Sequence, residues 1–149
     1  MDHPTFKAAD PQYEARVRAS FGRQEMMRTL GVRITSLGPG WIELEFDHDE
    51  RFTQQHGFLH AGAIAAVLDS ACGYAAFSLM PDDAAVLTVE YKINLLKPAS
   101  HDRYKATGIV VRSGRTLTVC RGQIEPDSGE PIAIMTGTLA TVTGTSIQH

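Results

Sequence analysis

Residues 61–80 constrain the fold most, because this stretch of 20 residues contains a single charged side chain, that of Asp69. Its length would suffice for a membrane-spanning helix. However, Ala, Gly and Ser make up much of the stretch, and a central Asp costs about 3 kcal/mol on membrane-insertion scales. The composition therefore favours a long helix buried in the core of a globular domain.

A helical wheel places a stripe of small residues on the same side as Asp69, within roughly 60° of it. The stripe consists of Gly62, Ala65, Ala66, Cys72, Gly73 and Ala76. A buried carboxylate is costly unless it is paired or used in chemistry. We therefore expect another segment or a bound molecule to lie against these small residues.

The bulk composition fits one globular domain, residues 1–149, with 43% hydrophobic and 21% charged residues. A net charge of −3, with both signs scattered, gives no electrostatic footprint for nucleic acid or an anionic membrane. Cys72 and Cys120 form no Cys-x-x-Cys pair, and the first residues lack the pattern of a signal peptide. These features predict a cytoplasmic protein with reduced thiols.

Periodicity divides the chain into helices and strands. Residues 1–12 are polar, contain two prolines and are expected to be flexible, whereas residues 13–30 carry apolar side chains at an imperfect helical period. Extended runs cover residues 32–37 and 41–46, around the turn signal Gly38-Pro39-Gly40, and the long helix follows. Four more extended runs cover residues 85–96, 104–112, 116–125 and 132–143. This order predicts an α+β domain in which an antiparallel sheet wraps around a buried helix.

Alternation within residues 85–96 predicts one apolar and one polar face for this strand. The apolar face is expected to contain Leu87, Val89, Tyr91, Ile93 and Leu95. Thr88 falls on the polar face, where it could orient a water molecule or be an ordinary strand residue.

Short motifs surround the long helix. Gly57, His60 and Gly62 precede or begin it, and Asp69 follows nine positions beyond His60. Together with residues 86–94, 97–99 and 111–117, these motifs resemble the hotdog-fold thioesterases, specifically the PaaI-like branch. The resemblance implies a hotdog fold, in which an antiparallel sheet wraps around a long central α-helix. It also implies an acyl-CoA substrate and a homodimer or dimer of dimers with the site at the subunit interface.

The chain departs from the family pattern at three positions. Ala61 stands where the family usually has the first Gly of His-Gly-Gly, which affects loop geometry more than the backbone N–H donor. Gln54 stands where Asn is common, as in relatives that act on aromatic acyl-CoA thioesters. Gly73 stands where relatives with Glu at the Asp69 position often carry a hydroxyl, which argues against a hydroxyl role there.

The loop from Gly57 to Gly62 leads into a helix N-terminus, where unpaired N–H groups and the dipole favour negative charge. A thioester carbonyl held there would be polarised by the Ala61 N–H, with Gly57 and Gly62 contacting the substrate. Loss of such a donor typically costs about 3–4 kcal/mol of transition-state stabilisation. The structural alternative is a loop kept small for packing alone.

Asp69 is the candidate nucleophile or general base, and both roles stay open. The structural alternative is a buried Asp bonded to Ser or Thr groups without chemistry. Nine residues of helix separate it from His60, about 13 Å at the helical rise. It therefore cannot reach a carbonyl held at the N-terminus of its own helix, and the site must combine two subunits.

Two loop residues have supporting roles in this hypothesis. Gln54 is expected to hydrogen-bond the thioester oxygen or orient water, the alternative being a surface polar residue. His60 is expected to position the loop rather than carry the proton. His56 and His60 are four apart, but the intervening Gly57 and the absence of a third nearby ligand argue against a metal site.

A basic turn follows the second of the four later strands. The resemblance places this region near the nucleotide of coenzyme A, whose phosphates suit guanidinium groups. The residues concerned are Arg112, Ser113, Gly114 and Arg115. The alternative is a basic surface turn, with Gly114 permitting a bulge.

The leading hypothesis is an acyl-CoA thioesterase that acts on an aromatic or medium-chain acyl group without a metal or redox cofactor, since coenzyme A belongs to the substrate. One alternative keeps the fold but only binds acyl-CoA or an acyl carrier. Another is a hotdog enoyl-CoA hydratase, although the closely spaced Asp and His of those relatives are missing.

Overall fold

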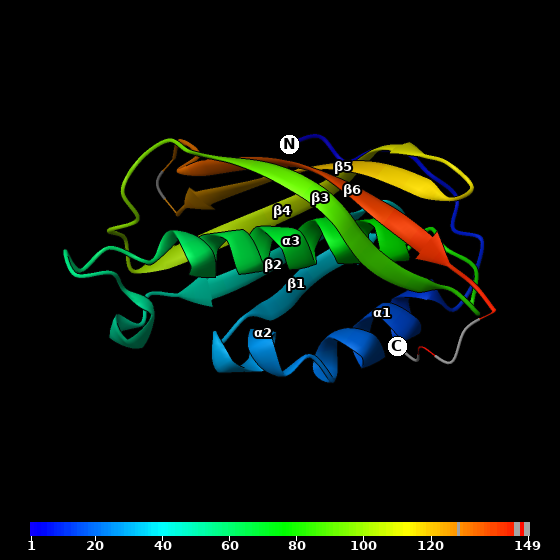
Figure 1. Cartoon of the computed structure of the whole chain (residues 1–149), viewed down its shortest axis with the longest axis horizontal. Helices are drawn as coiled ribbons and strands as arrows, with labels where there is room; N and C mark the ends of the chain where they lie inside the picture. The colour runs from blue at the N-terminus through cyan, green and yellow to red at the C-terminus, as the bar shows by residue number, and fades with distance from the viewer. Residues whose placement is uncertain (128, 145–146, 148–149) are drawn as a thin grey trace.

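A six-stranded antiparallel sheet curls around the long helix α3 (Ala61–Phe77) in the computed structural model, which describes residues 1–127, 129–144 and 147 (Figure 1). The strand order is β1-β2-β4-β5-β6-β3. The strands are β1 (Arg33–Gly38), β2 (Trp41–Asp47), β3 (Ala85–Leu95), β4 (Arg103–Ser113), β5 (Leu117–Pro126) and β6 (Ala133–Val142). Each strand end lies within one residue of its predicted position. The predicted α+β hotdog architecture is thereby confirmed.

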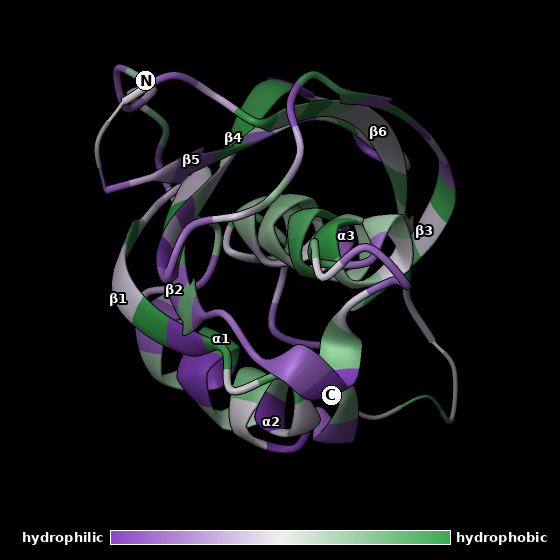
Figure 2. Cartoon of the chain, turned by 90° about the vertical axis from the view of Figure 1, so that its left-hand side faces the viewer, coloured by the Kyte–Doolittle hydropathy of each residue, from purple (hydrophilic) through white to green (hydrophobic). Residues whose placement is uncertain are grey.

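The central helix is enclosed by the sheet, as the end-on view shows (Figure 2). Leu68, Ala71 and Phe77 have no exposed surface. The helix ends three residues before the predicted Met80, because the Leu79 and Met80 N–H groups donate to carbonyl oxygens only three residues back. The Ser78 hydroxyl donates to the Ala75 carbonyl oxygen (2.7 Å) and accepts from the Gly40 N–H (2.8 Å). No helix in the described part of the chain is long and apolar enough to cross a bilayer.

At Gly108 of β4 the backbone of α3 lies so close to the strand that there is no room for a side chain. A Cβ atom at this position would lie 2.4 Å from both the carbonyl carbon and the carbonyl oxygen of Ala71. Because these are backbone atoms, no side chain could move to make room. The absence of a side chain at residue 108 therefore sets how closely α3 packs on β4.

The single helix predicted over residues 13–30 is in fact two helices, α1 (Tyr13–Gly22) and α2 (Glu25–Thr29). Gln24 adopts an extended backbone conformation, which interrupts the helical path. Arg16 ties α1 to the end of the central helix, donating to the carbonyl oxygens of Met80 (2.7 Å) and Pro81 (3.1 Å). Its guanidinium also pairs with Asp10 (2.9 Å), within residues 1–12, which form no helix or strand.

The predicted faces of β3 are wrong at one end of the strand. A register shift between Thr88 and Glu90 inserts one extra residue opposite β6. Thr88 pairs with the buried Leu139, so it points toward α3 on the same face as Tyr91, whereas Leu87 points outward. The bulge thus brings the Thr88 hydroxyl to the helix that carries Asp69.

Candidate active site

The loop before α3 is folded by a tight turn at Gly57. This glycine has φ of +85°, a conformation that side-chain-bearing residues rarely adopt. The Gly57 N–H donates to the Gln54 carbonyl oxygen (3.0 Å), and the Gln54 N–H donates to the Phe58 carbonyl oxygen (2.8 Å). The turn therefore fixes the position of Gln54 relative to the helix start.

His60 caps the N-terminus of α3. Its Nδ1 accepts a hydrogen bond from the Gly62 N–H (2.8 Å), so that nitrogen carries no proton. The Ala63 and Ile64 N–H groups donate to the His60 carbonyl oxygen. Across the described ranges, the Ala61 N–H alone among these first four helical donors has no hydrogen-bond partner. It is thus the donor available to an oxyanion at the positive end of the helix.

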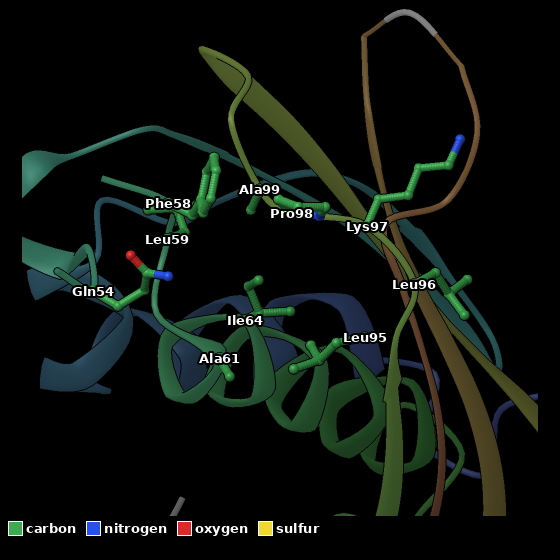
Figure 3. A pocket seen from close by; sticks show the side chains of 10 residues that line it. All are labelled: Gln54, Phe58, Leu59, Ala61, Ile64, Leu95, Leu96, Lys97, Pro98 and Ala99. Atoms are coloured by element: carbon green, nitrogen blue, oxygen red, sulfur yellow. The ribbon is translucent and has the colours of Figure 1, made fainter. Parts of the chain in front are cut away.

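Ala61 and Gln54 share a cavity of about 360 Å³, which we call the loop pocket (Figure 3). Its walls include Ile64 and, from the end of β3 and the following residues, Leu95 and Lys97. The Gln54 Oε1 accepts from the His56 N–H, and its amide nitrogen points into the cavity. The loop pocket therefore combines mostly apolar walls with the Gln54 amide and the backbone of Ala61, an arrangement that suits a carbonyl oxygen.

Asp69 lies in a second, smaller cavity of about 160 Å³, which we call the acid pocket. Its lining consists of Gln24, Asp69, Ser70, Gly73, Tyr74, Val86 and Thr88. The Thr88 hydroxyl donates to Asp69 Oδ1 (2.8 Å). Burial raises the pKa of the Asp69 carboxyl, and the Thr88 hydrogen bond partly opposes this rise. The carboxylate is therefore both oriented and more basic than an exposed Asp.

Within one chain, the loop pocket with Ala61 lies far from the acid pocket with Asp69. Ala61 and Asp69 are eight residues apart on one continuous helix, about 12 Å along its axis. Among the described residues, none lines both pockets. Along β3, Leu95 of the loop pocket and Thr88 of the acid pocket are seven residues apart, about 23 Å of extended strand.

The basic turn lies at a third cavity, of about 480 Å³, beside the C-terminal end of α3. Ser113, Gly114 and Arg115 line it together with Met80 and Thr141, whereas Arg112 does not. The strand irregularity expected at Gly114 lies earlier, between Val110 and Arg112, and Gly114 instead makes a tight turn by donating to the Leu117 carbonyl oxygen (2.8 Å).

Sequence reasoning missed Ser70 and Gln24, which share a hydrogen bond at the acid pocket. Ser70, to which the sequence analysis gave no role, lines this cavity beside Asp69. Gln24 was expected to lie inside a continuous helix over residues 13–30, with no role in a site. The only signal in the sequence was the weak apolar period around Gly22-Arg23-Gln24, because the approach of this break to α3 depends on tertiary packing.

Solved structures with this fold include two thioesterase-related proteins. A thioesterase family protein from Silicibacter pomeroyi is 53% identical and superposes with a TM-score of 0.86, over 89% of this chain and 99% of that one. The E. coli PaaI protein, from the phenylacetic acid degradation operon, superposes with a TM-score of 0.83 at 21% identity, over 90% of this chain and 96% of that one. The predicted PaaI-like hotdog fold is confirmed.

Comparison of amino-acid sequences points to the same family as the solved structures. A 1,4-dihydroxy-2-naphthoyl-CoA hydrolase of Listeria monocytogenes is 23% identical over 115 residues, which cover 77% of this chain and 94% of the hydrolase. Residues 56–133, which include the helix start, Asp69 and β3, match the family description "Thioesterase superfamily". The chain belongs to the thioesterase superfamily.

Proposed function

We propose that this chain is an acyl-CoA thioesterase, which hydrolyses a thioester to a free acid and coenzyme A. The observation that carries the proposal is the pairing of two features on α3. The Ala61 N–H at its start has no partner among the described residues, and the hydrogen-bonded Asp69 lies in a cavity at its middle. The first suits an oxyanion, and the second suits a base or nucleophile. Membership of the thioesterase superfamily supports this assignment.

The exposed edge of β3 supports assembly as a homodimer, alone or within a dimer of dimers. β3 is the last strand of the sheet and pairs with β6 on one side. Leu87, Val89 and Tyr91 are 47%, 57% and 45% exposed. A long apolar edge strand promotes uncontrolled association unless it is covered. A second copy, paired antiparallel along β3, would cover it and close the assembly.

This pairing would also join the two half-sites. In an antiparallel pair, the Leu95 end of one β3 lies beside the Ala85 end of the other. The loop pocket lies at the Leu95 end, and the acid pocket lies near the opposite end, through Val86 and Thr88. Ala61 of one subunit would thereby approach Asp69 of the partner subunit, and each dimer would contain two such sites.

The proposed reaction needs only the thioester and water. The thioester carbonyl oxygen accepts hydrogen bonds from the Ala61 N–H and the Gln54 amide. Asp69 of the partner subunit either adds to the carbonyl carbon, giving an acyl anhydride that water then hydrolyses, or removes a proton from a water that adds directly. In both routes the C–S bond breaks, and the coenzyme A sulfur leaves as a thiolate that takes up a proton.

The basic turn supports coenzyme A as the leaving group. Its cavity includes Thr141, which pairs with Val86 near the start of β3, so it lies at the end that a partner's loop pocket would approach. Arg115 in that cavity, and Arg112 beside it, would contact the coenzyme A phosphates, with Ser113 and Gly114 shaping the turn. The two buried, free cysteines suit a reducing compartment, and we place the protein in the cytoplasm.

A panel of acyl-CoA esters, assayed for released thiol, tests the proposal. Asp69→Asn should lower kcat by roughly 100- to 10,000-fold, while the matched change Asp82→Asn at an exposed loop position should leave it unchanged. Because Cys72 and Cys120 are buried, the protein adds little background to a thiol reagent. Tight binding of acyl-CoA without thiol release would instead identify a binding module, and equal rates for both variants would remove Asp69 from the chemistry.

A further inference from the structure

Gln24 reaches the acid pocket from the break between α1 and α2. Its extended backbone turns the side chain toward α3, where the amide Oε1 accepts a hydrogen bond from the Ser70 hydroxyl (3.0 Å). Ser70 is the residue after Asp69, so the amide stands beside the carboxylate-bearing turn of the helix. None of the reaction steps proposed above uses Gln24.

A second hydrogen bond between α1 and α3, one helical turn away from the Gln24–Ser70 contact, also fixes the position of the break. The buried Ser20 hydroxyl, four residues before Gln24, bonds the Tyr74 hydroxyl, four residues after Ser70 (3.1 Å). Arg16 adds its hydrogen bonds to the end of α3. Three contacts therefore fix the distance between the helix pair and α3, and Gln24 is a positioned wall of the pocket rather than a free surface side chain.

The side-chain amide of Gln24 has N–H groups that are available as hydrogen-bond donors. Its oxygen is engaged by Ser70, and its two N–H groups have no acceptor among residues 1–127, 129–144 and 147. The side chain is half-buried and lines a cavity whose other walls include Tyr74 and Val86. At Gly73, which also lines the cavity, a Cβ atom would meet no described neighbour within 4 Å, so the cavity is open at this wall. A volume of about 160 Å³ is close to that of a cavity that binds a single aromatic ring.

We propose that Gln24 is a specificity-determining residue, whose amide hydrogen-bonds an oxygen on the far end of the acyl group. This inference rests on the proposed thioesterase function, which brings the thioester carbon to Asp69 and directs the acyl group past Gly73. A hydroxyl or keto oxygen at the end of a compact acyl group accepts from the Gln24 N–H groups. An unsubstituted acyl group of the same length strips water from these donors and returns no hydrogen bond, so it is disfavoured.

The test compares matched thioesters that differ by one oxygen: 3-hydroxybutanoyl- with butanoyl-CoA, 4-oxopentanoyl- with pentanoyl-CoA, and 4-hydroxybenzoyl- with benzoyl-CoA. For at least one pair, wild type should favour the oxygenated ester in kcat/KM. Gln24→Met, which keeps the length of the side chain but removes its donors, should reduce that preference about tenfold, mainly by slowing the oxygenated ester. Gln12→Met, the same change at an exposed position before α1, should preserve it.

Binding to the Asp69→Asn background provides a second readout that does not depend on turnover. Dissociation constants for the same pairs should show the same loss of preference when Gln24→Met is added. Absence of thiol release from every ester would refute the proposed function and leave the binding comparison to decide the role of Gln24. Equal preferences with and without the Gln24 amide, in both kinetics and binding, would overturn the inference.

Discussion

Gly108→Ala should damage both stability and the position of Asp69. The added Cβ would lie 2.4 Å from the carbonyl carbon and oxygen of Ala71, whereas ordinary contacts begin near 3.4 Å. The helix and β4 must therefore separate by about 1 Å. Overpacking of this kind costs about 1–3 kcal/mol, and we expect the upper end because both opposing atoms are backbone. For a chain of this length, this corresponds to a fall in Tm of roughly 6–12 °C.

The same displacement reaches the proposed chemistry, since Asp69 lies two residues before Ala71 on α3. A misplacement of about 1 Å can cost roughly 100-fold in rate. We therefore expect kcat/KM for a good thioester substrate to fall by about 10- to 100-fold at a temperature where the variant is fully folded. Thermal unfolding followed by circular dichroism, together with thiol release, measures both effects.

Gly22→Ala is the matched control. A Cβ atom at this last residue of α1 meets nothing within 4 Å, so the variant should gain about 0.5–1 kcal/mol from the reduced entropy of the unfolded chain. A Gly108→Ala protein with an unchanged Tm and undiminished kcat/KM would refute the argument that this glycine sets the packing of α3 on the sheet.

Two further perturbations test the electrostatics. Arg16→Met should lower the free energy of unfolding, measured in urea, by about 2–3 kcal/mol, because it removes a largely buried ion pair and the hydrogen bonds to the end of α3. The control Arg18→Met, at an exposed ion pair, should lower it by about 0.3–0.5 kcal/mol. Similar losses in the two variants would contradict the role of Arg16 in tying α1 to α3. Burial raises the pKa of the Asp69 carboxyl above its ordinary value, so its contribution to stability is complete below about pH 4 and is lost as pH rises through the folded-state pKa. Asp69→Asn should therefore have a higher Tm than wild type at about pH 7 but not at about pH 3, and a lower Tm at neutral pH would show that the ionised carboxylate is stabilised instead.

Much of the fold could be predicted because the relevant signals are local. The alternation of each strand and the long uncharged run around Asp69 need no knowledge of tertiary contacts, and the helical rise alone separates Ala61 from Asp69. These features sufficed for the sheet, the central helix and the argument that one chain cannot complete the site.

The remaining features depend on pairing and packing between distant segments. The bulge that turns Thr88 toward Asp69 exists only in the register of β3 against β6. The break at Gln24 lies where hydrogen bonds join Ser20 of α1 to Tyr74 and Gln24 itself to Ser70, both on α3. A single-sequence pattern contains neither relationship, so Thr88 was placed on the wrong face of its strand and the approach of Gln24 to Ser70 was missed.

The central claim is that each site combines the helix start of one subunit with the carboxylate of the other. Ala61→Pro is a clean way to remove the helix-start donor, because proline is favoured at the first helical position and His60 already has the extended backbone that must precede it. This variant and Asp69→Asn should each be nearly inactive alone.

Mixing the two variants in equal amounts, with subunit exchange verified by distinct tags, is the most direct measurement. If the site is shared, half of the dimers are hybrids and half of the sites in each hybrid are intact, so about a quarter of wild-type activity should return. If each subunit holds a complete site, every site carries one defect. Exchange without any recovery of activity would therefore contradict the account.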